Sequence, residues 1–340
     1  MKRNFTFFLL LFCFSGFGQQ ENSISQNKFT WKKAARFSLI VGQAGGKNWA
    51  SGSDVFSISV NSFLDVYANG QNDKWYFNNS LIASYGFINS DEYATIKNDD
   101  KIDFFSTAGV YLKNRPELGI GAAFNFRSQF SNGYDRDYLN QGLKRRTSGF
   151  FAPAYITIAP VGVSYNKRNI DVYATTFGFR GVVVSNAPYS YLFQGGIIPG
   201  DIINDKNPAN TERSLATMYG VDPQKNILVQ AGPYISVGYN KEIFKNVIYS
   251  GRLDAFSDFI HSKPDNIDVF WTNTFYLKVN KWLNAVYSLD LAYDDDIKKF
   301  GYFKDHPALQ AKSILGVGIS TRFGKKKDKT HKRMDDKMHN

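Results

Sequence analysis

The feature of this 340-residue chain that most limits its fold is a recurring segment in which apolar and polar side chains alternate. In residues 118–130, apolar side chains occupy every second position except Ser128, and the positions between them are mostly small or polar. A period of two is typical of a β-strand with one apolar and one polar face. Twelve such segments occur, at residues 34–43, 54–68, 74–88, 102–113, 117–130, 149–165, 169–183, 227–240, 246–260, 267–280, 284–295 and 311–323.

The length and spacing of these segments point to a membrane. Strands of soluble proteins usually run about 5–6 residues, whereas these segments approach or exceed the roughly 9–11 residues that a tilted strand needs to cross a bilayer. Short connections alternate with mostly longer ones, of which residues 184–226 are the longest. Short periplasmic turns opposite longer loops are typical of outer-membrane barrels. A soluble β-sandwich with buried aromatic residues is the alternative, and it explains neither the segment length nor this asymmetry.

The sequence therefore predicts an all-β fold, a transmembrane antiparallel up-and-down β-barrel of about 12 strands. The bilayer core offers no water to unpaired backbone groups, so a β-chain that crosses it must close on itself. An even number of strands places both ends of the barrel on the short-turn side, in the periplasm. The polar face of each strand is then expected to line the lumen, and the apolar face to meet lipid.

The N-terminus has the layout of a cleaved export signal. Two basic residues, Lys2 and Arg3, precede the apolar run Phe5–Phe14, and small and polar residues follow that run. We expect residues 1–19 to be this signal, 20–33 a periplasmic segment, 34–323 the barrel and 324–340 a disordered basic periplasmic tail. The predicted location is the outer membrane. The single cysteine, Cys13, lies within the signal, so its removal excludes disulfides and thiol chemistry from the mature chain.

The formal net charge of +11 raises the question of a nucleic-acid partner. No nucleic-acid motif is visible and the chain carries an export signal, so no nucleic acid is expected. The basic tail is interpreted as solvated. If it has a function, the expected one is electrostatic contact with anionic lipid or glycan. The expected partners are outer-membrane lipid and lipopolysaccharide, the outer-membrane assembly machinery and a small solute. No cofactor is expected.

Five short stretches, taken in order, resemble a known family. They are Asn48-Trp49-Ala50-Ser51-Gly52, Gln129-Phe130-Ser131-Asn132-Gly133-Tyr134, Ala152-Pro153-Ala154-Tyr155, Tyr293-Asp294-Asp295-Asp296, and the closing Leu309-Gln310-Ala311-Lys312 with Gly316-Val317-Gly318 and Arg322-Phe323. Together they resemble a family of gram-negative exported proteins catalogued as domain of unknown function 3078. The resemblance implies an outer-membrane barrel and brings no assigned catalytic residue. The chain departs from the family pattern at Ser53, where a second glycine is usual.

Charged residues on the polar faces are the candidate functional groups of the lumen. They are Arg127, Arg180, Arg252, Asp254, Asp258, Lys278, Asp290 and Arg322. In a lumen these charges either pair and fill a narrow barrel or set the selectivity of a conducting pore. A twelve-stranded barrel lies between filled eight-stranded barrels and open porins, so both interpretations stay open.

An acidic run at the predicted rim is the candidate metal site. Asp294, Asp295 and Asp296 end one segment, and Asp99, Asp100 and Asp103 lie around another. Carboxylates gathered at one rim could bind a hard cation through oxygen, although the spacing is not that of an EF-hand. An acidic loop end that is simply solvated is the competing interpretation.

The predicted function is an outer-membrane barrel that binds or passes small solutes through a charged lumen, gated by the loop at residues 184–226. The alternative is a structural or surface-interaction barrel with a plugged lumen. A rim hydrolase that acts on lipid is the third candidate, with His261 and His306 as its loop histidines. No Gly-x-Ser-x-Gly motif occurs and no triad setting is identifiable, so no enzyme and no catalytic residue is expected.

The last predicted strand generates a prediction about assembly. Phe323 ends the alternation, and outer-membrane barrels characteristically finish on an aromatic residue at the periplasmic edge. We expect Phe323→Ala to lower insertion into the outer membrane several-fold, measured as the membrane-embedded, heat-modifiable fraction. Truncation after Gly324 is the control and should leave insertion unchanged; the reverse result would show that the last strand is misplaced.

Overall fold

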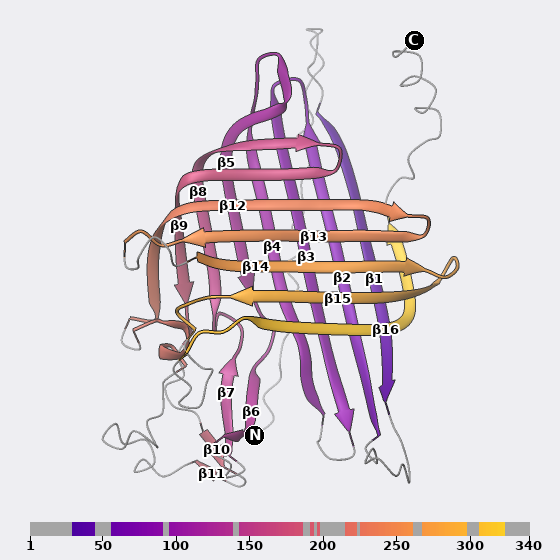
Figure 1. Ribbon diagram of the computed structural model, residues 1–340, viewed down its shortest axis with the longest axis vertical. Coiled ribbons are helices and arrows are strands. Elements are labelled where there is room, and N and C mark those ends of the chain that lie inside the picture. The colour runs from indigo at the N-terminus through magenta and orange to yellow at the C-terminus, as the bar shows by residue number, and fades with distance from the viewer. Residues whose placement is uncertain are drawn as a thin grey trace, which may run out of the picture.

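The computed structural model describes residues 29–44, 56–90, 95–138, 143–185, 191–193, 196–197, 215–222, 225–260, 267–297 and 306–323. Twelve antiparallel strands form a closed barrel in the order β1-β16-β15-β14-β13-β12-β9-β8-β5-β4-β3-β2 (Figure 1). The first six are β1 (Thr30–Ala44), β2 (Ser57–Gln71), β3 (Trp75–Ser90), β4 (Ile96–Leu112), β5 (Arg115–Ser128) and β8 (Ala154–Lys167). The others are β9 (Ile170–Val183), β12 (Ile227–Phe244), β13 (Val247–Ser257), β14 (Ile267–Lys278), β15 (Leu283–Tyr293) and β16 (Gln310–Phe323). In the described part of the chain, no helix has the length and apolar character needed to span a membrane.

The predicted fold class is confirmed. Each of the twelve predicted segments corresponds to one barrel strand, and each strand pairs with its neighbours along the chain. The barrel closes between β1 and β16, whose register runs from Ala35 opposite Phe323 to Val41 opposite Val317. Closure leaves the sheet without a free edge, as a β-chain in a bilayer requires.

Short turns and longer connections lie at opposite ends of the barrel, which we call the turn end and the loop end. Several turns contain a residue with positive φ, among them Asn114, Arg168, Asn169 and Asn246. Asparagine tolerates the left-handed backbone region better than most residues, which explains its recurrence in these tight turns.

Several strand boundaries differ from the prediction. Strand β4 begins at Ile96, well before the predicted start at 102, and β12 extends to Phe244, beyond the predicted end at 240. Strand β1 begins at Thr30, so residues 30–33 belong to the barrel and not to a preceding segment. The segment predicted at 149–165 begins as strand β8 only at Ala154. Phe151 has a φ of 52°, and Pro153 carries no backbone N–H to donate, so regular pairing cannot extend through them. The predicted signal at 1–19 and tail at 324–340 lie outside the described residues.

A second, smaller sheet lies at the loop end and was missed by the sequence prediction. It contains β6 (Gly133–Tyr138), β7 (Leu143–Ser148), β10 (Tyr191–Phe193) and β11 (Gly196–Ile197), in the order β11-β10-β7-β6. A 3₁₀ helix at Thr217–Tyr219 also lies at the loop end. These strands are short and lack extended alternation, so the period-two pattern could not reveal them.

The two faces of the barrel wall have opposite character. On β5, Ala123, Asn125 and Arg127 face inward, whereas Ile120 and Phe124 are exposed on the outside. In Figure 1, strands β12–β16 run across the strands β1–β4 that lie behind them, so two walls of the barrel cross. Inward side chains of one wall therefore meet those of the other, as in two sheets that pack at a steep angle.

The closing strand gives a prediction about folding. A Cβ added at Gly318 would overlap the carbonyl oxygen of Leu39 and lie 2.7 Å from the Cα of Ile40, both backbone atoms of β1. We expect Gly318→Val to reduce the folded, heat-modifiable fraction several-fold, because the backbone of β1 would have to move. Gly181→Val is the matched control, since a Cβ there would meet no atom nearer than 3.7 Å. Equal folding of the two variants would contradict this account of closure.

Candidate functional site

Four charged side chains form a cluster across the lumen, which we call the central ion-pair cluster: Asp103, Arg127, Arg252 and Asp254. The Nη2 atom of Arg127 lies 2.9 Å from Asp103 Oδ2 and 2.8 Å from Asp254 Oδ2. Arg252 bonds Asp254 through Nε at 3.0 Å and contacts Asp103 through Nη2. Asp103 and Arg127 come from β4 and β5, whereas Arg252 and Asp254 come from β13, so the cluster joins walls that are not adjacent in the sheet.

The central cluster is buried and balanced. The two arginines and two aspartates carry no net charge, and the Asp103 residue is only 1% exposed. Neutral donors satisfy further oxygens: Asn125 donates to Asp103 at 2.9 Å and the Tyr234 hydroxyl to Asp254 at 2.8 Å. Burying a charge is costly unless it is paired and hydrogen-bonded, and here each carboxylate has both kinds of partner.

A second bridge lies nearer the loop end, around Arg180 of β9. Its Nη2 contacts Asp268 of β14, and its Nε donates to Gln230 Oε1 at 2.7 Å. Gln230 in turn donates to Asp296 at 3.0 Å. Strands β12 and β13 separate β9 from β14 in the sheet, so this bridge also spans part of the lumen.

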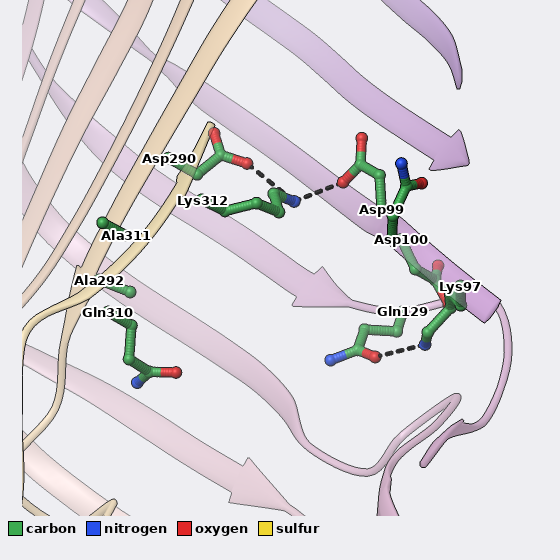
Figure 2. A pocket seen from close by; sticks show the side chains of 10 residues that line it. Lys97, Asp99, Asp100, Gln129, Asp290, Ala292, Gln310, Ala311 and Lys312 are labelled. Carbon is green, nitrogen blue, oxygen red and sulfur yellow. Dashed lines mark hydrogen bonds and ion pairs between the residues drawn. The ribbon is translucent and has the colours of Figure 1, made fainter. Parts of the chain in front are cut away.

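A third group of charges surrounds a cavity of about 410 Å³ at the loop end, which we call the vestibule. Lys101 lies 2.9 Å from Asp290, and Lys312 lies 3.1 Å from the same carboxylate. Figure 2 shows Lys312 between Asp290 and Asp99, with which it forms ion pairs. The vestibule is also lined by Lys97, Asn98, Asp100, Gln129, Ala292, Gln310 and Ala311.

Tyrosines bridge other parts of the lumen. The Tyr276 hydroxyl of β14 donates to Asp65 of β2 at 2.5 Å, and the Tyr76 hydroxyl of β3 donates to Ser164 of β8 at 2.8 Å. Neither pair joins neighbouring strands. With the ion pairs above, these contacts connect opposite walls of the described lumen at several places.

Of the eight lumen charges predicted from the sequence, six lie inside the barrel or are buried at its loop end, and two are exposed at its turn end. Arg127, Arg252 and Asp254 meet in the central cluster, Arg180 joins the second bridge, and Asp290 lines the vestibule. Asp258 is buried just beyond β13 and accepts from the backbone N–H of Ile260 at 2.9 Å. Lys278 and Arg322 are exposed at the turn-end termini of their strands.

The acidic run contributes two of its three members to a cluster. Carboxylate oxygens of Asp268, Asp294 and Asp295 lie within 4.8 Å of one another, so Asp268 takes the place predicted for Asp296. Several of these oxygens already have partners: Asp268 contacts Arg180, and Asp294 accepts from the Tyr155 hydroxyl at 2.9 Å. The cluster is therefore already engaged in protein contacts and carries no assignment as a metal site.

The carboxyl groups after β15 have perturbed acidity. Burial, followed by the neighbouring Asp268 carboxylate, raises the pKa of Asp294 from 3.8 to about 7 against the opposing effect of Arg180. Burial and the Asp296 carboxylate raise the pKa of Asp295 to about 6. Loss of these protons at higher pH places additional negative charge at the loop end of the barrel.

Part of the 184–226 loop packs over the loop end. Leu215, Ala216, Met218, Tyr219 and Val221 are buried there against side chains from other segments. Those side chains are Ala152, Tyr155, Val182 and Ile297, and Val184 at the start of the loop joins the same cluster. The Tyr219 hydroxyl also donates to the Thr147 carbonyl at 2.6 Å. We call this contact region the mouth cluster; much of the rest of the 184–226 loop lies outside the described residues.

The sequence analysis did not assign several partners of these networks to the lumen. It placed Asp103 with the acidic rim, whereas the structure places that carboxylate in the central cluster. Asp103 and Lys312 lie on the inward faces of predicted strands and could have been found by extending the alternation. Lys101 and Asp268 lie near the loop ends of their strands, where the face is harder to assign from the pattern. Of the two histidines considered for a hydrolase, His306 is exposed and His261 lies outside the described residues.

Part of the chain matches a known protein family. Residues 41–134 match the model of a family described as a protein of unknown function (DUF3078), which confirms the predicted resemblance over that segment. No curated protein matches the chain.

Several solved outer-membrane proteins are similar at low identity. An outer-membrane channel from Pseudomonas putida F1 has 9% identity and a TM-score of 0.34, covering 89% of this chain and 100% of its own. The CymD monoaromatic hydrocarbon channel has 10% identity and a TM-score of 0.27, with coverages of 89% and 90%. OmpT of Vibrio cholerae has 9% identity and a TM-score of 0.25, with coverages of 89% and 99%. These scores are too low to transfer any function to this chain.

The raised pKa of Asp294 generates a prediction about stability. A carboxyl group whose pKa is raised by folding stabilises the fold when protonated, below its ordinary pKa of 3.8, and this contribution is lost as the pH rises to about 7. We expect Asp294→Asn to reduce the fall in melting temperature between pH 4 and pH 7, measured by heat-modifiability in detergent. Asp222→Asn, at an exposed position, is the control and should retain the wild-type slope. An unchanged slope in Asp294→Asn would contradict the assignment.

Proposed function

We propose that the protein is an outer-membrane barrel and that its outer wall faces lipid. Large apolar side chains are exposed on this wall, and soluble monomers rarely expose contiguous apolar patches of more than a few hundred Å². Examples are Phe37, Leu39, Val41, Ile120, Phe124, Ile158, Val163, Phe179, Val229, Leu315, Val317 and Ile319. Trp31, Trp75, Trp271 and Trp282 are exposed as well and suit the aromatic girdles of such barrels.

We further propose that the barrel is a gated channel for small polar solutes, seen here in a closed conformation. The observation that carries this proposal is the central ion-pair cluster, which joins opposite walls of the lumen. Buried ion pairs are often replaceable by apolar residues without loss of stability, so a permanent plug does not require them. Charged groups can exchange their mutual contacts for water, and this makes the cluster suitable as a reversible constriction.

The lining of the vestibule supports the proposal that the solute is polar. Its lining contains lysines and aspartates of both signs together with amide side chains. Such a surface offers donors and acceptors but little apolar area, so it suits a small polar or zwitterionic molecule better than a hydrocarbon. The described part of the 184–226 loop covers a different part of the loop end through the mouth cluster, and in this proposal its displacement accompanies opening.

A structural barrel with a permanently filled lumen is the second candidate. The observation that favours it is the extent of pairing, because tyrosine bridges such as Tyr276 to Asp65 add to the ion pairs. The mouth cluster adds an apolar seal at the loop end. The two candidates differ in whether the wild-type lumen ever opens.

Single-channel recording in planar bilayers distinguishes the two candidates. We expect wild-type protein to be mostly closed with brief openings, and the variant D103A/R127A/R252A/D254A to conduct at least several-fold more on average. The variant removes both signs together, so it leaves no unpaired charge in the cluster. The control R115A/E117A also removes one residue of each sign, at the turn end of β5 and outside the cluster, and should stay mostly closed.

Two results would contradict the channel. A folded quadruple variant that remains closed would show that the central cluster is not the constriction. A wild-type protein that never opens, at any voltage at which the quadruple variant conducts, would support the filled structural barrel instead.

A further inference from the structure

A row of polar residues crosses three neighbouring strands near the vestibule. Asn61 of β2 lies directly opposite Gly86 of β3, and Gly86 lies directly opposite Asp99 of β4. Residues opposite one another in a sheet share a face, so all three belong to the inward face. Gly86 has no side chain and leaves a space between its two polar neighbours.

A β-bulge brings a fourth residue to the same place. Gly86 pairs with Asp99 and Phe87 pairs with Lys97, so Asn98 is the extra residue of β4. A Cβ added at Gly86 would overlap the Oδ1 atom of Asn61 and lie 2.6 Å from the Oδ1 atom of Asn98. Both amide oxygens are therefore directed into the space above Gly86. Bulges commonly re-aim a side chain in this way.

The oxygens around this space have unused hydrogen-bonding capacity. Asn61 Oδ1, Asn98 Oδ1 and Asp99 Oδ2 are buried and have no hydrogen-bond partner among the described residues. The Asn61 and Asp99 residues are only 1% and 2% exposed. The next inward residue of β3, Ser84, also has an unpartnered oxygen and is 2% exposed. Leaving a buried acceptor unpaired costs about 1–3 kcal/mol, so a gathering of several requires an explanation.

The chemistry of these atoms favours a metal cation. The two amide oxygens and the carboxylate oxygen are all acceptors, so the group that is missing from this space is a hydrogen-bond donor or a cation. A water molecule donates only two hydrogen bonds and cannot satisfy three acceptors at once. Calcium takes carboxylate oxygens, amide oxygens and water together, in a flexible arrangement of 6–8 ligands. Magnesium demands a smaller, nearly ideal octahedron, which side chains from three strands with a bulge are less suited to form.

Charge at the site favours weak binding. The second oxygen of Asp99 already contacts Lys312, which also lies 3.1 Å from Asp290. One shared carboxylate therefore supplies the only negative charge among the three oxygen donors. Few charged ligands give weak calcium sites, with dissociation constants of about 10⁻⁴–10⁻³ M. Asn98 and Asp99 line the vestibule, so an ion in that cavity has access to the site.

We propose that Asn61, Asn98 and Asp99 form a calcium site on the wall of the vestibule. Gly86 provides its floor, and water supplies the remaining ligands. The site is separate from the acidic cluster of Asp268, Asp294 and Asp295, and it does not depend on whether the lumen conducts. Bound calcium would fix the bulge of β4 against β2 and β3 and add a positive charge to the loop end of the lumen.

Terbium luminescence in the refolded full-length protein tests the site, because Tb³⁺ replaces Ca²⁺ at oxygen ligands. We expect wild-type protein to bind Tb³⁺ saturably and Ca²⁺ to displace it more effectively than Mg²⁺ at equal ionic strength. Asn61→Leu and Asn98→Leu keep the side-chain volume but remove the oxygen, and each should lower Tb³⁺ affinity about tenfold or more. Gly86→Ala, which places a methyl group in the space, should have the same effect.

The control variant is Asp295→Asn, which alters the acidic cluster and should leave the Ca²⁺-displaceable binding unchanged. Heat-modifiability identifies the variants that fold. If one of the substituted barrels does not fold, the Tb³⁺ titration of the wild-type protein still tests the proposal. The proposal is overturned if wild-type protein shows no saturable binding. It is also overturned if binding persists in the folded asparagine variants or is lost only in Asp295→Asn.

Discussion

Closure of the backbone hydrogen-bond ladder is the constraint on which the rest of this structure depends. The pairing of β1 with β16 removes the last free edge of the sheet, and each barrel strand then has a partner on both sides. Once the sheet is closed, successive side chains of each strand point alternately to the outside and into the lumen. The closing strand shows this directly: Leu315, Val317 and Ile319 are exposed outside, and Gly316, Gly318 and Ser320 face in.

Closure has an electrostatic consequence because the inward face carries charge. The walls cross, so arginines and aspartates of distant strands come within contact distance of one another. Arg127 reaches both Asp103 of the neighbouring strand β4 and Asp254 of the distant strand β13. The ion pairs are therefore a product of barrel shape as much as of sequence, and they make the lumen polar without making it open. Reversible exchange of these contacts with water is the step that the proposed channel requires.

The sequence predicted the fold well because period-two alternation is a local property. All twelve barrel strands, the turn and loop ends and the faces of β5 and β16 follow from it. Contacts across the lumen depend on strand tilt and register, which the local pattern does not contain. Lys312 pairs with Asp99, 213 positions away in sequence, and Asp268 replaces Asp296 in the acidic cluster. The small sheet at the loop end was missed for another reason, since its strands are too short to show a period.

Two polar regions of the lumen differ in how their hydrogen-bonding capacity is used. In the central ion-pair cluster, the charges balance and both carboxylates have charged and neutral partners from the protein, and the atom left there without a partner among the described residues, Arg252 Nη1, is a donor. Around Gly86, acceptors gather without donors, although two of the residues that supply them are almost completely buried. A barrel that needed only to be filled could satisfy Asn61 and Asn98 by pairing them with each other or replace them with apolar residues. Retention of uncompensated oxygens beside a glycine is better explained by a cation that belongs there, so this imbalance distinguishes a binding site from structural filling.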